Sequence, residues 1–206
     1  KLRYSIFNTN FSSSSEKEIT LKLLAEISSS NSDSVNVDYL VKLESSLWNR
    51  YPSEYPELVI QVNKEIESIC LKLIDSDQVV NLVYFKNNLA TAQSNLSVQY
   101  GILKDSDNAI IYGNKCLQLY MIQKDTMGIS WSLYNLGLEY ENLDEYKKAF
   151  EYHFKRLELY KNSSLYSESF IDEIYGIGVT YSVTGKNHLG IEYQELAILL
   201  CENNGN

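Results

Sequence analysis

The feature that most constrains the fold of this chain is an internal repeat with a period of about 40 residues. The segment NLSVQY at residues 95–100 returns as NLGLEY at residues 135–140, which lie 40 positions further on. A third copy, IGVTY at residues 177–181, follows its counterpart LGLEY after 41 positions. Repeats of this length are typical of solenoids, in which each unit packs on its neighbours. The chain is therefore expected to fold as a linear array of similar units.

The spacing of apolar residues indicates that each unit consists of two helices. In the middle copy, apolar or small residues recur at i, i+3, i+4 and i+7 between Leu133 and Tyr140, which is one face of a helix. The predicted helices of this unit cover residues 126–141 and 144–161. Asp144 is the predicted N-cap of the second helix.

The rest of the chain also has the sequence character of helices. Only 2 Pro and 9 Gly occur among 206 residues, which is few for an all-β protein. We predict an all-α fold of eight or nine helices in a single domain, residues 1–206, with clear repeats from about residue 78 onwards. Because the chain begins with Lys1 rather than Met, we expect it to be a piece of a longer protein. The further segments expected to be helical are residues 16–28, 37–51, 56–74 and 78–101.

The repeat resembles the tetratricopeptide repeat family, whose signature has Leu-Gly and Tyr on the first helix and Tyr and Ala on the second. The resemblance in the middle unit is carried by Leu136, Gly137, Tyr140, Tyr146 and Ala149. The small residues Gly137 and Ala149 are expected to let the paired helices approach closely. The usual repeat of the family has 34 residues, so the units here are longer. The resemblance implies a right-handed superhelical solenoid of antiparallel helix pairs, with the first helix of each pair lining a concave face.

A peptide-binding face is expected on these first helices. In the family, an asparagine one position before the Leu-Gly pair often holds a bound peptide by its backbone. Asn95 and Asn135 occupy this position, and an Asn amide can both donate to and accept from a peptide group. The alternative is that they are solvated surface residues, and for Trp131 it is a buried packing role. Helical spacing extends the predicted face to Asn88, Thr91, Trp131, Tyr134, Leu138, Asn142 and Tyr175, with Asp172 and Val179 beside the last.

No arrangement of residues in the sequence predicts catalysis, a metal site or a cofactor. His153 and His188 are the only histidines, and neither has a Cys or second His at the spacing of metal ligands. We interpret His153 as a packed or half-exposed residue and His188 as solvated. The many carboxylates are interpreted as a solvated acidic face. The protein is therefore expected to be no enzyme and to need no cofactor.

The overall charge and the cysteines limit the class of partner. The formal net charge of −9 disfavours direct binding to nucleic acid. No apolar run approaches the ~20 residues of a membrane-spanning helix. The three widely separated cysteines are typical of reduced thiols in a cytoplasmic protein. We expect a neutral or basic linear peptide or a protein as partner, with a homodimer as an alternative.

Two functions fit these observations. The long repeats and the composition rich in Asn, Lys, Ile, Tyr and Ser are similar to those of the peptide-pheromone receptors of Gram-positive bacteria, which often carry a helix-turn-helix ahead of the repeats. This resemblance implies a peptide sensor in signalling and transcription regulation. The alternative is a constitutive scaffold or oligomerisation domain that uses another surface. An enzyme with an unrecognised site is the least favoured alternative.

Overall fold

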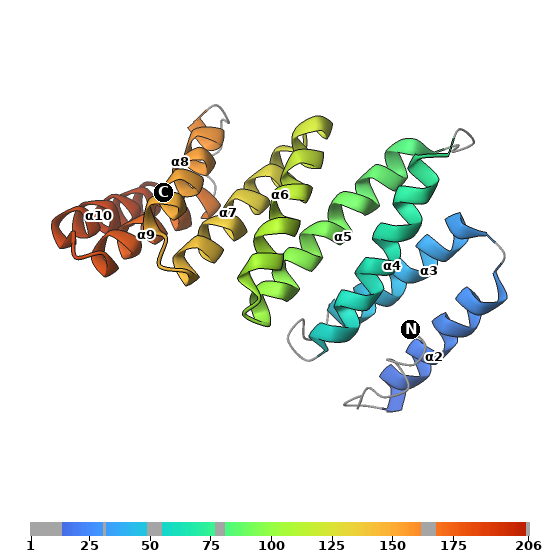
Figure 1. Ribbon diagram of the computed structural model, residues 1–206. Helices are drawn as coiled ribbons and strands as arrows, with labels where there is room; N and C mark the ends of the chain where they lie inside the picture. Colours follow the sequence, from blue (N-terminus) through green and yellow to red (C-terminus); the bar gives the residue numbers. More distant parts are fainter. Residues whose placement is uncertain (1–13, 31, 49–54, 77–80, 162–167, 205–206) are drawn as a thin grey trace. The chain divides into compact units, whose positions relative to one another are not determined.

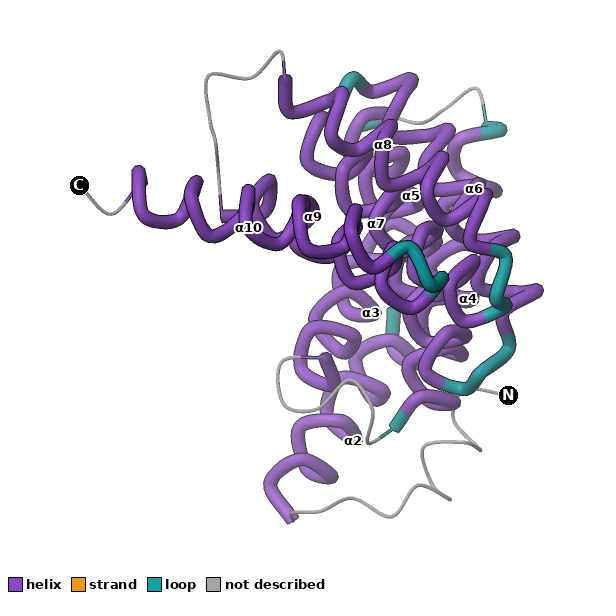
Figure 2. The backbone as a smooth tube through the Cα atoms, turned by 90° about the vertical axis from the view of Figure 1, so that its left-hand side faces the viewer, coloured by secondary structure: helices purple, strands orange, loops and turns teal. Residues whose placement is uncertain are grey.

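All regular structure in the described part of the chain is α-helical (Figure 1, Figure 2). This part comprises residues 14–30, 32–48, 55–76, 81–161 and 168–204 of a computed structural model. It contains nine helices in sequential antiparallel pairs, which confirms the predicted all-α fold. The helices are α2 (Ser14–Ser29), α3 (Asp33–Trp48), α4 (Pro56–Ile74), α5 (Leu82–Ile102), α6 (Ser106–Gln123), α7 (Thr126–Asn142), α8 (Tyr146–Lys161), α9 (Glu168–Val183) and α10 (Asn187–Asn204).

The chain divides into two compact units, residues 1–119 and 120–206, which we call unit 1 and unit 2. In unit 1, the described core lies among α2, α3, α4 and α5, with aliphatic side chains filling the space between them. The most deeply buried of these are Val37, Leu40, Leu43, Val59, Val62 and Cys70. In unit 2, α9 packs against α10 through Ile171, Ile174 and Ala197. Each unit thus buries apolar helix faces of its own.

The helix boundaries follow the predictions closely, with two corrections, of which the first is that α3 begins at Asp33, four residues before its predicted start at residue 37. α4 and α7 begin at the predicted residues, Pro56 and Thr126. α5 begins at Leu82, and the predicted starting residue, 78, lies outside the described residues, as does residue 51 at the predicted end of α3. The prediction that Asp144 caps α8 is wrong, because Asp144 has a φ of 57° and α8 begins two residues later.

The turn inside each of the three C-terminal helix pairs is built in the same way. Lys104, Asp144 and Gly185 occupy equivalent positions and have φ values of 61°, 57° and 79°. In each turn, the next residue donates its N–H to the carbonyl of a tyrosine five positions earlier, at 2.9 Å. This left-handed residue ends the first helix of the pair and satisfies one of its terminal carbonyls. Asp144 therefore closes α7 rather than opening α8.

Small residues allow close contact between the two helices of each pair, as predicted. Ser97 donates its hydroxyl to the carbonyl of Ala109 at 2.8 Å. A Cβ atom added to Gly178 would lie 2.9 Å from the carbonyl oxygen of Gly190. Beside these contacts, a tyrosine of the first helix packs its ring on a tyrosine of the second, with centroids 5.4–5.6 Å apart. The pairs are Tyr100 with Tyr112, Tyr140 with Tyr152, and Tyr181 with Tyr193.

Candidate functional site

Unit 2 contains a cavity of about 450 Å³ between α7, α8 and α9. α7 and α9 contribute residues that recur three or four positions apart, and α8 contributes two residues seven positions apart, so each set lies on one helix face. From α7 and α8 these are Tyr134, Leu138, Glu141, Asn142, Tyr146 and His153. From α9 they are Asp172, Glu173, Tyr175, Gly176, Val179, Thr180 and Val183.

The floor of the cavity is formed by a buried histidine between two glutamates. His153 is only 3% exposed. Its Nδ1 lies 2.7 Å from Oε1 of Glu173, and its Nε2 lies 3.3 Å from Oε1 of Glu141. The imidazole also faces Gly137, whose missing side chain leaves room for the ring. Burial of His153 confirms its interpretation as a packed residue.

An arginine completes this buried network. Arg156 forms an ion pair with Oε2 of Glu173, and its Nε donates to the hydroxyl of Ser130 at 3.1 Å. Its guanidinium also lies over the ring of Tyr134, 4.7 Å from the centroid. Glu173 is only 3% exposed, and a buried carboxylate is costly unless it is paired. Arg156 and His153 both contact this carboxylate and compensate its charge.

The network shifts the pKa values of its members. Burial disfavours the charged imidazole of His153, but the nearby carboxylate of Glu141 and the hydrogen-bonded carboxylate of Glu173 outweigh it and raise the pKa to about 9. The pKa of Glu141 is lowered: burial opposes its ionisation, but His153 and the hydroxyl of Thr180 favour it more strongly. At neutral pH the floor therefore holds an imidazolium beside ionised Glu141.

One polar atom at the floor has no hydrogen-bond partner among the described residues. The Nε2 atom of His153 is buried, and its approach to Glu141 does not have hydrogen-bond geometry. Buried polar atoms are nearly always paired in folded proteins. Nε2 is thus a buried donor at the floor that lies in an ion-pair contact with Glu141 but makes no hydrogen bond.

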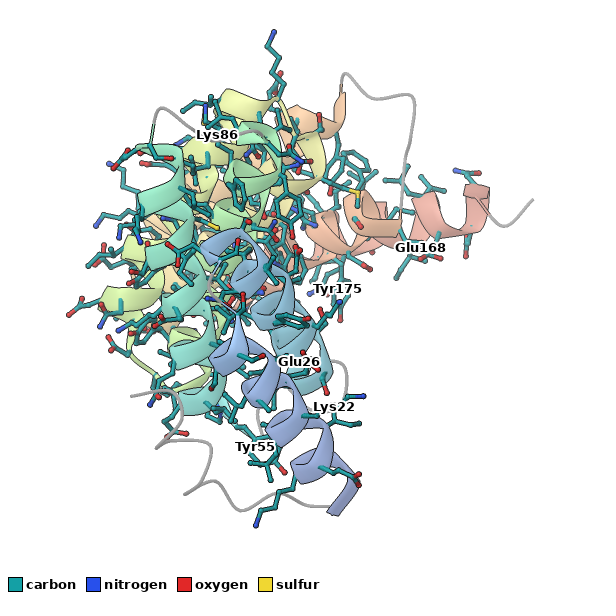
Figure 3. The ribbon with its side chains drawn as sticks, turned by 90° about the vertical axis from the view of Figure 1, so that its right-hand side faces the viewer. Lys22, Glu26, Tyr55, Lys86, Glu168 and Tyr175 are labelled. Carbon is teal, nitrogen blue, oxygen red and sulfur yellow. The ribbon has the colours of Figure 1, made fainter. Side chains whose placement is uncertain are left out.

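Of the residues predicted to bind a peptide, four line this cavity. They are Tyr134, Leu138, Asn142 and Tyr175, and Asp172 and Val179 join them. Tyr175 projects from α9 and is 52% exposed (Figure 3). Asn135 and Trp131 lie on α7 but do not line the cavity. The alternative that Trp131 is buried is wrong, because its side chain is 48% exposed.

The other three predicted residues belong to unit 1. The amide of Asn95 donates to Oε1 of Glu44 at 2.9 Å, and that of Asn88 donates to the carbonyl of Tyr84 at 3.0 Å. Thr91 is exposed. Both asparagine amides thus have partners inside unit 1, and their contact with a peptide stays a prediction.

Sequence reasoning missed the buried polar floor. The interpretation of the carboxylates as a solvated face is wrong for Glu173, which is buried. A signal was present in the repeat: Glu173 occupies the position filled by Ala92 and Ser132 in the two preceding units. Both of those residues are 1% exposed, so the position faces the interior. A charged residue there requires partners, which His153 and Arg156 provide.

Comparison with known proteins agrees with this architecture. Residues 132–152, which cover the α7–α8 turn, match the tetratricopeptide repeat family. No curated protein matches the chain by sequence. The chain thus carries a tetratricopeptide repeat within an array of helix pairs, as its sequence predicted.

Several solved structures share the fold at low sequence identity. Aspartyl phosphate phosphatase F from Bacillus subtilis is 15% identical with a TM-score of 0.68, over 86% of this chain and 43% of that protein. The apo form of RapI is 14% identical with a TM-score of 0.73, over 91% of this chain and 49% of RapI. MamA is 20% identical with a TM-score of 0.59, over 82% of this chain and 81% of MamA. The chain thus spans less than half of the first two proteins, and the likeness concerns the fold.

Two further features of the described residues bear on function. No group of three or more His, Cys, Asp or Glu residues there is arranged to hold a metal ion. None of the described helices has both the length and the apolar character that crossing a membrane requires.

Proposed function

We propose that the chain binds a short linear peptide segment of a partner protein in the cavity of unit 2, without catalysis. The observation that carries this proposal is the composition of the cavity. Aromatic and aliphatic side chains, such as Tyr175 and Val179, stand beside a small number of polar groups, such as Asn142. This combination is typical of ligand sites, in which apolar contact supplies affinity and a few polar groups fix orientation.

The length of the cavity suits a few residues of extended chain. Its lining runs from Asp172 to Val183 along α9, which is about 17 Å at 1.5 Å per helical residue. An extended peptide advances about 3.3 Å per residue, so about five residues fit.

The charges at the cavity favour a neutral or basic peptide over an acidic one. Asp172 is exposed at the rim, and Glu141 is ionised at the floor. The formal net charge of the whole chain, −9, acts in the same direction. An acidic peptide would therefore be repelled on approach as well as within the cavity.

A regulatory role follows if binding changes how the helices of unit 2 pack. A peptide in the cavity would contact both α7 and α9, which belong to successive helix pairs. Such a ligand would favour the arrangement of helices that it fits best. We therefore propose that the chain is a cytoplasmic peptide-sensing module in signalling or transcription regulation, as its resemblance to peptide receptors implies.

The proposal is tested by selecting peptides from a random decapeptide library on the wild-type chain and measuring their affinity by fluorescence anisotropy. Tyr175→Ala and Val179→Asp are expected to weaken binding by about tenfold or more. Ile191→Ala is the matched control, because Ile191 is 55% exposed on α10 and does not line the cavity. Unchanged affinity in both cavity variants would contradict the proposal.

A second candidate function is self-association or scaffolding through α10. Ile191, Ile198 and Leu199 lie at i, i+7 and i+8 on this helix, and each is more than half exposed. Analytical ultracentrifugation of wild type and Ile198→Asp separates the two functions. A dimer that Ile198→Asp dissociates, together with peptide binding that Tyr175→Ala does not affect, would favour the scaffold.

A further inference from the structure

We infer that the cavity floor reads an amide group of the bound peptide, with Nε2 of His153 donating to the amide carbonyl and Glu141 accepting from the amide N–H. The inference rests on the proposed function and specifies its ligand. The amide belongs either to the peptide backbone or to an Asn or Gln side chain. No charged group of the ligand occupies this place.

The donor side of this pair is the buried Nε2 atom. Nδ1 of His153 already has Glu173 as its partner at 2.7 Å, so Nε2 is the nitrogen that remains, and it faces Glu141, which lines the cavity. Nε2 lies 3.3 Å from Glu141 without hydrogen-bond geometry. A carbonyl oxygen in the cavity would give this N–H the hydrogen bond that it lacks. Because the imidazole is charged at neutral pH, this hydrogen bond would be stronger than one between neutral groups.

The acceptor side is the carboxylate of Glu141. Its side chain is one-quarter exposed and lines the cavity. One oxygen accepts from the hydroxyl of Thr180, and a carboxylate has about four lone-pair sites in all. An N–H of the ligand can therefore bind Glu141 while the contact with Thr180 remains.

The charges around His153 select a neutral ligand group. Glu141 faces the ring from α7 and Glu173 from α9, while Arg156 on α8 pairs with Glu173. Two carboxylates and two cations cancel, and Asp172 at the rim adds one negative charge. A ligand carboxylate would meet Glu141, and an ammonium group would meet the imidazolium. An amide supplies both an acceptor and a donor without either repulsion.

The test uses the chain with ¹⁵N-labelled histidine and a peptide selected from the random decapeptide library. His153 and His188 are the only histidines, and the exposed His188 on α10 is an internal reference. On saturation with the peptide, we expect the Nε2 resonance of His153 to shift and its pKa to rise. We expect His188 to stay unchanged. His153→Phe, which removes the donor, is expected to weaken binding by about tenfold.

Two sets of peptide variants identify the source of the amide. If the bound amide belongs to the peptide backbone, N-methylation of one peptide bond abolishes the shift at His153. If the bound amide belongs to a side chain, replacing Asn or Gln of the peptide by Ala abolishes the shift. Either result supports the inference.

Binding that depends on Tyr175 but leaves His153 unchanged would overturn the inference, and the proposed function would stand. Failure to select a peptide, or affinity that Tyr175→Ala does not alter, would overturn both. The histidine spectra of the wild-type chain decide the question even where His153→Phe fails to fold.

Discussion

The contact between Gly137 and His153 leads to a quantitative prediction for the variant Gly137→Ala. A Cβ atom at position 137 would lie 2.6 Å from Cε1 of the imidazole and 2.9 Å from both ring nitrogens. The ring is held by a carboxylate at each nitrogen, with Glu173 2.7 Å from Nδ1 and Glu141 3.3 Å from Nε2. It therefore cannot move away without stretching a buried ion pair.

The magnitude follows from opposing effects. Overpacking a buried site costs about 1–3 kcal/mol, and a rigid ring held on both sides favours the upper end. Ala is a better helix former than Gly by about 1 kcal/mol, which acts in the opposite direction. We expect Gly137→Ala to lower the free energy of unfolding of unit 2 by about 2 kcal/mol. If the ion pair to Glu173 breaks, the loss rises to about 4 kcal/mol.

Urea denaturation followed by Trp131 fluorescence measures this effect in a Trp48→Phe background, because Trp131 then reports on unit 2 alone. Gly176→Ala is the matched control. A Cβ atom at Gly176 would meet no atom within 4 Å, so this variant should stabilise α9 by about 1 kcal/mol. If the free energy of unfolding of Gly137→Ala equalled that of Gly176→Ala, the reasoning would be refuted.

Three further predictions concern pH and the turns. The pKa of His153 in the folded chain, about 9, lies above the ordinary value of 6.5, so its stabilisation of unit 2 should be full below pH 6.5 and lost as pH rises through 9. Urea midpoints between pH 6 and 10 check this, with His188→Gln unchanged from wild type. Burial raises the pKa of Glu44 from 4.5 to about 7, so the stability of unit 1 falls as pH rises from 4.5 through 7, and Glu44→Gln should stabilise the chain by about 1–3 kcal/mol at pH 8 but not at pH 4.5. Thermal melts followed by circular dichroism at both pH values test this prediction. Equal stabilisation by Glu44→Gln at pH 8 and pH 4.5 would count against it. Lys104→Gly should raise stability by about 1 kcal/mol and Gly185→Ala should lower it by a similar amount, since both positions have positive φ. If thermal melts showed that Lys104→Gly and Gly185→Ala change the melting temperature in the same direction, the argument from positive φ would be contradicted.

The fold was predictable because its determinants are local and repeated. The spacing from Leu133 to Tyr140 defines a helix face, and the repeat carries that pattern to the neighbouring units. The start of α4 follows from Pro56, which suits the first turn of a helix. The sequence does not show which helix Asp144 belongs to, because Asp suits both an N-cap and a left-handed turn.

The candidate site was predictable only in part. Tyr134, Leu138, Asn142 and Tyr175 follow from helical spacing on the first helices, and all four line the cavity. The floor of the cavity depends on α8. The repeat pattern does not indicate which residues of α9 face this helix. A sequence position does not reveal that His153 meets Glu173, since this contact is set by how successive pairs pack. The one indication of this contact in the repeat is that Glu173 occupies a position that is buried in the preceding units.

The peptide-binding role of unit 2 is tested most directly by mapping amide chemical shifts of the ¹⁵N-labelled chain on addition of a library-selected peptide. We predict that the largest changes fall on α7 and α9 at residues that line the cavity, among them Leu138, Asn142, Gly176 and Val179. Changes confined to α10 around Ile198, or to residues of unit 1, would contradict the proposal and place the binding surface elsewhere.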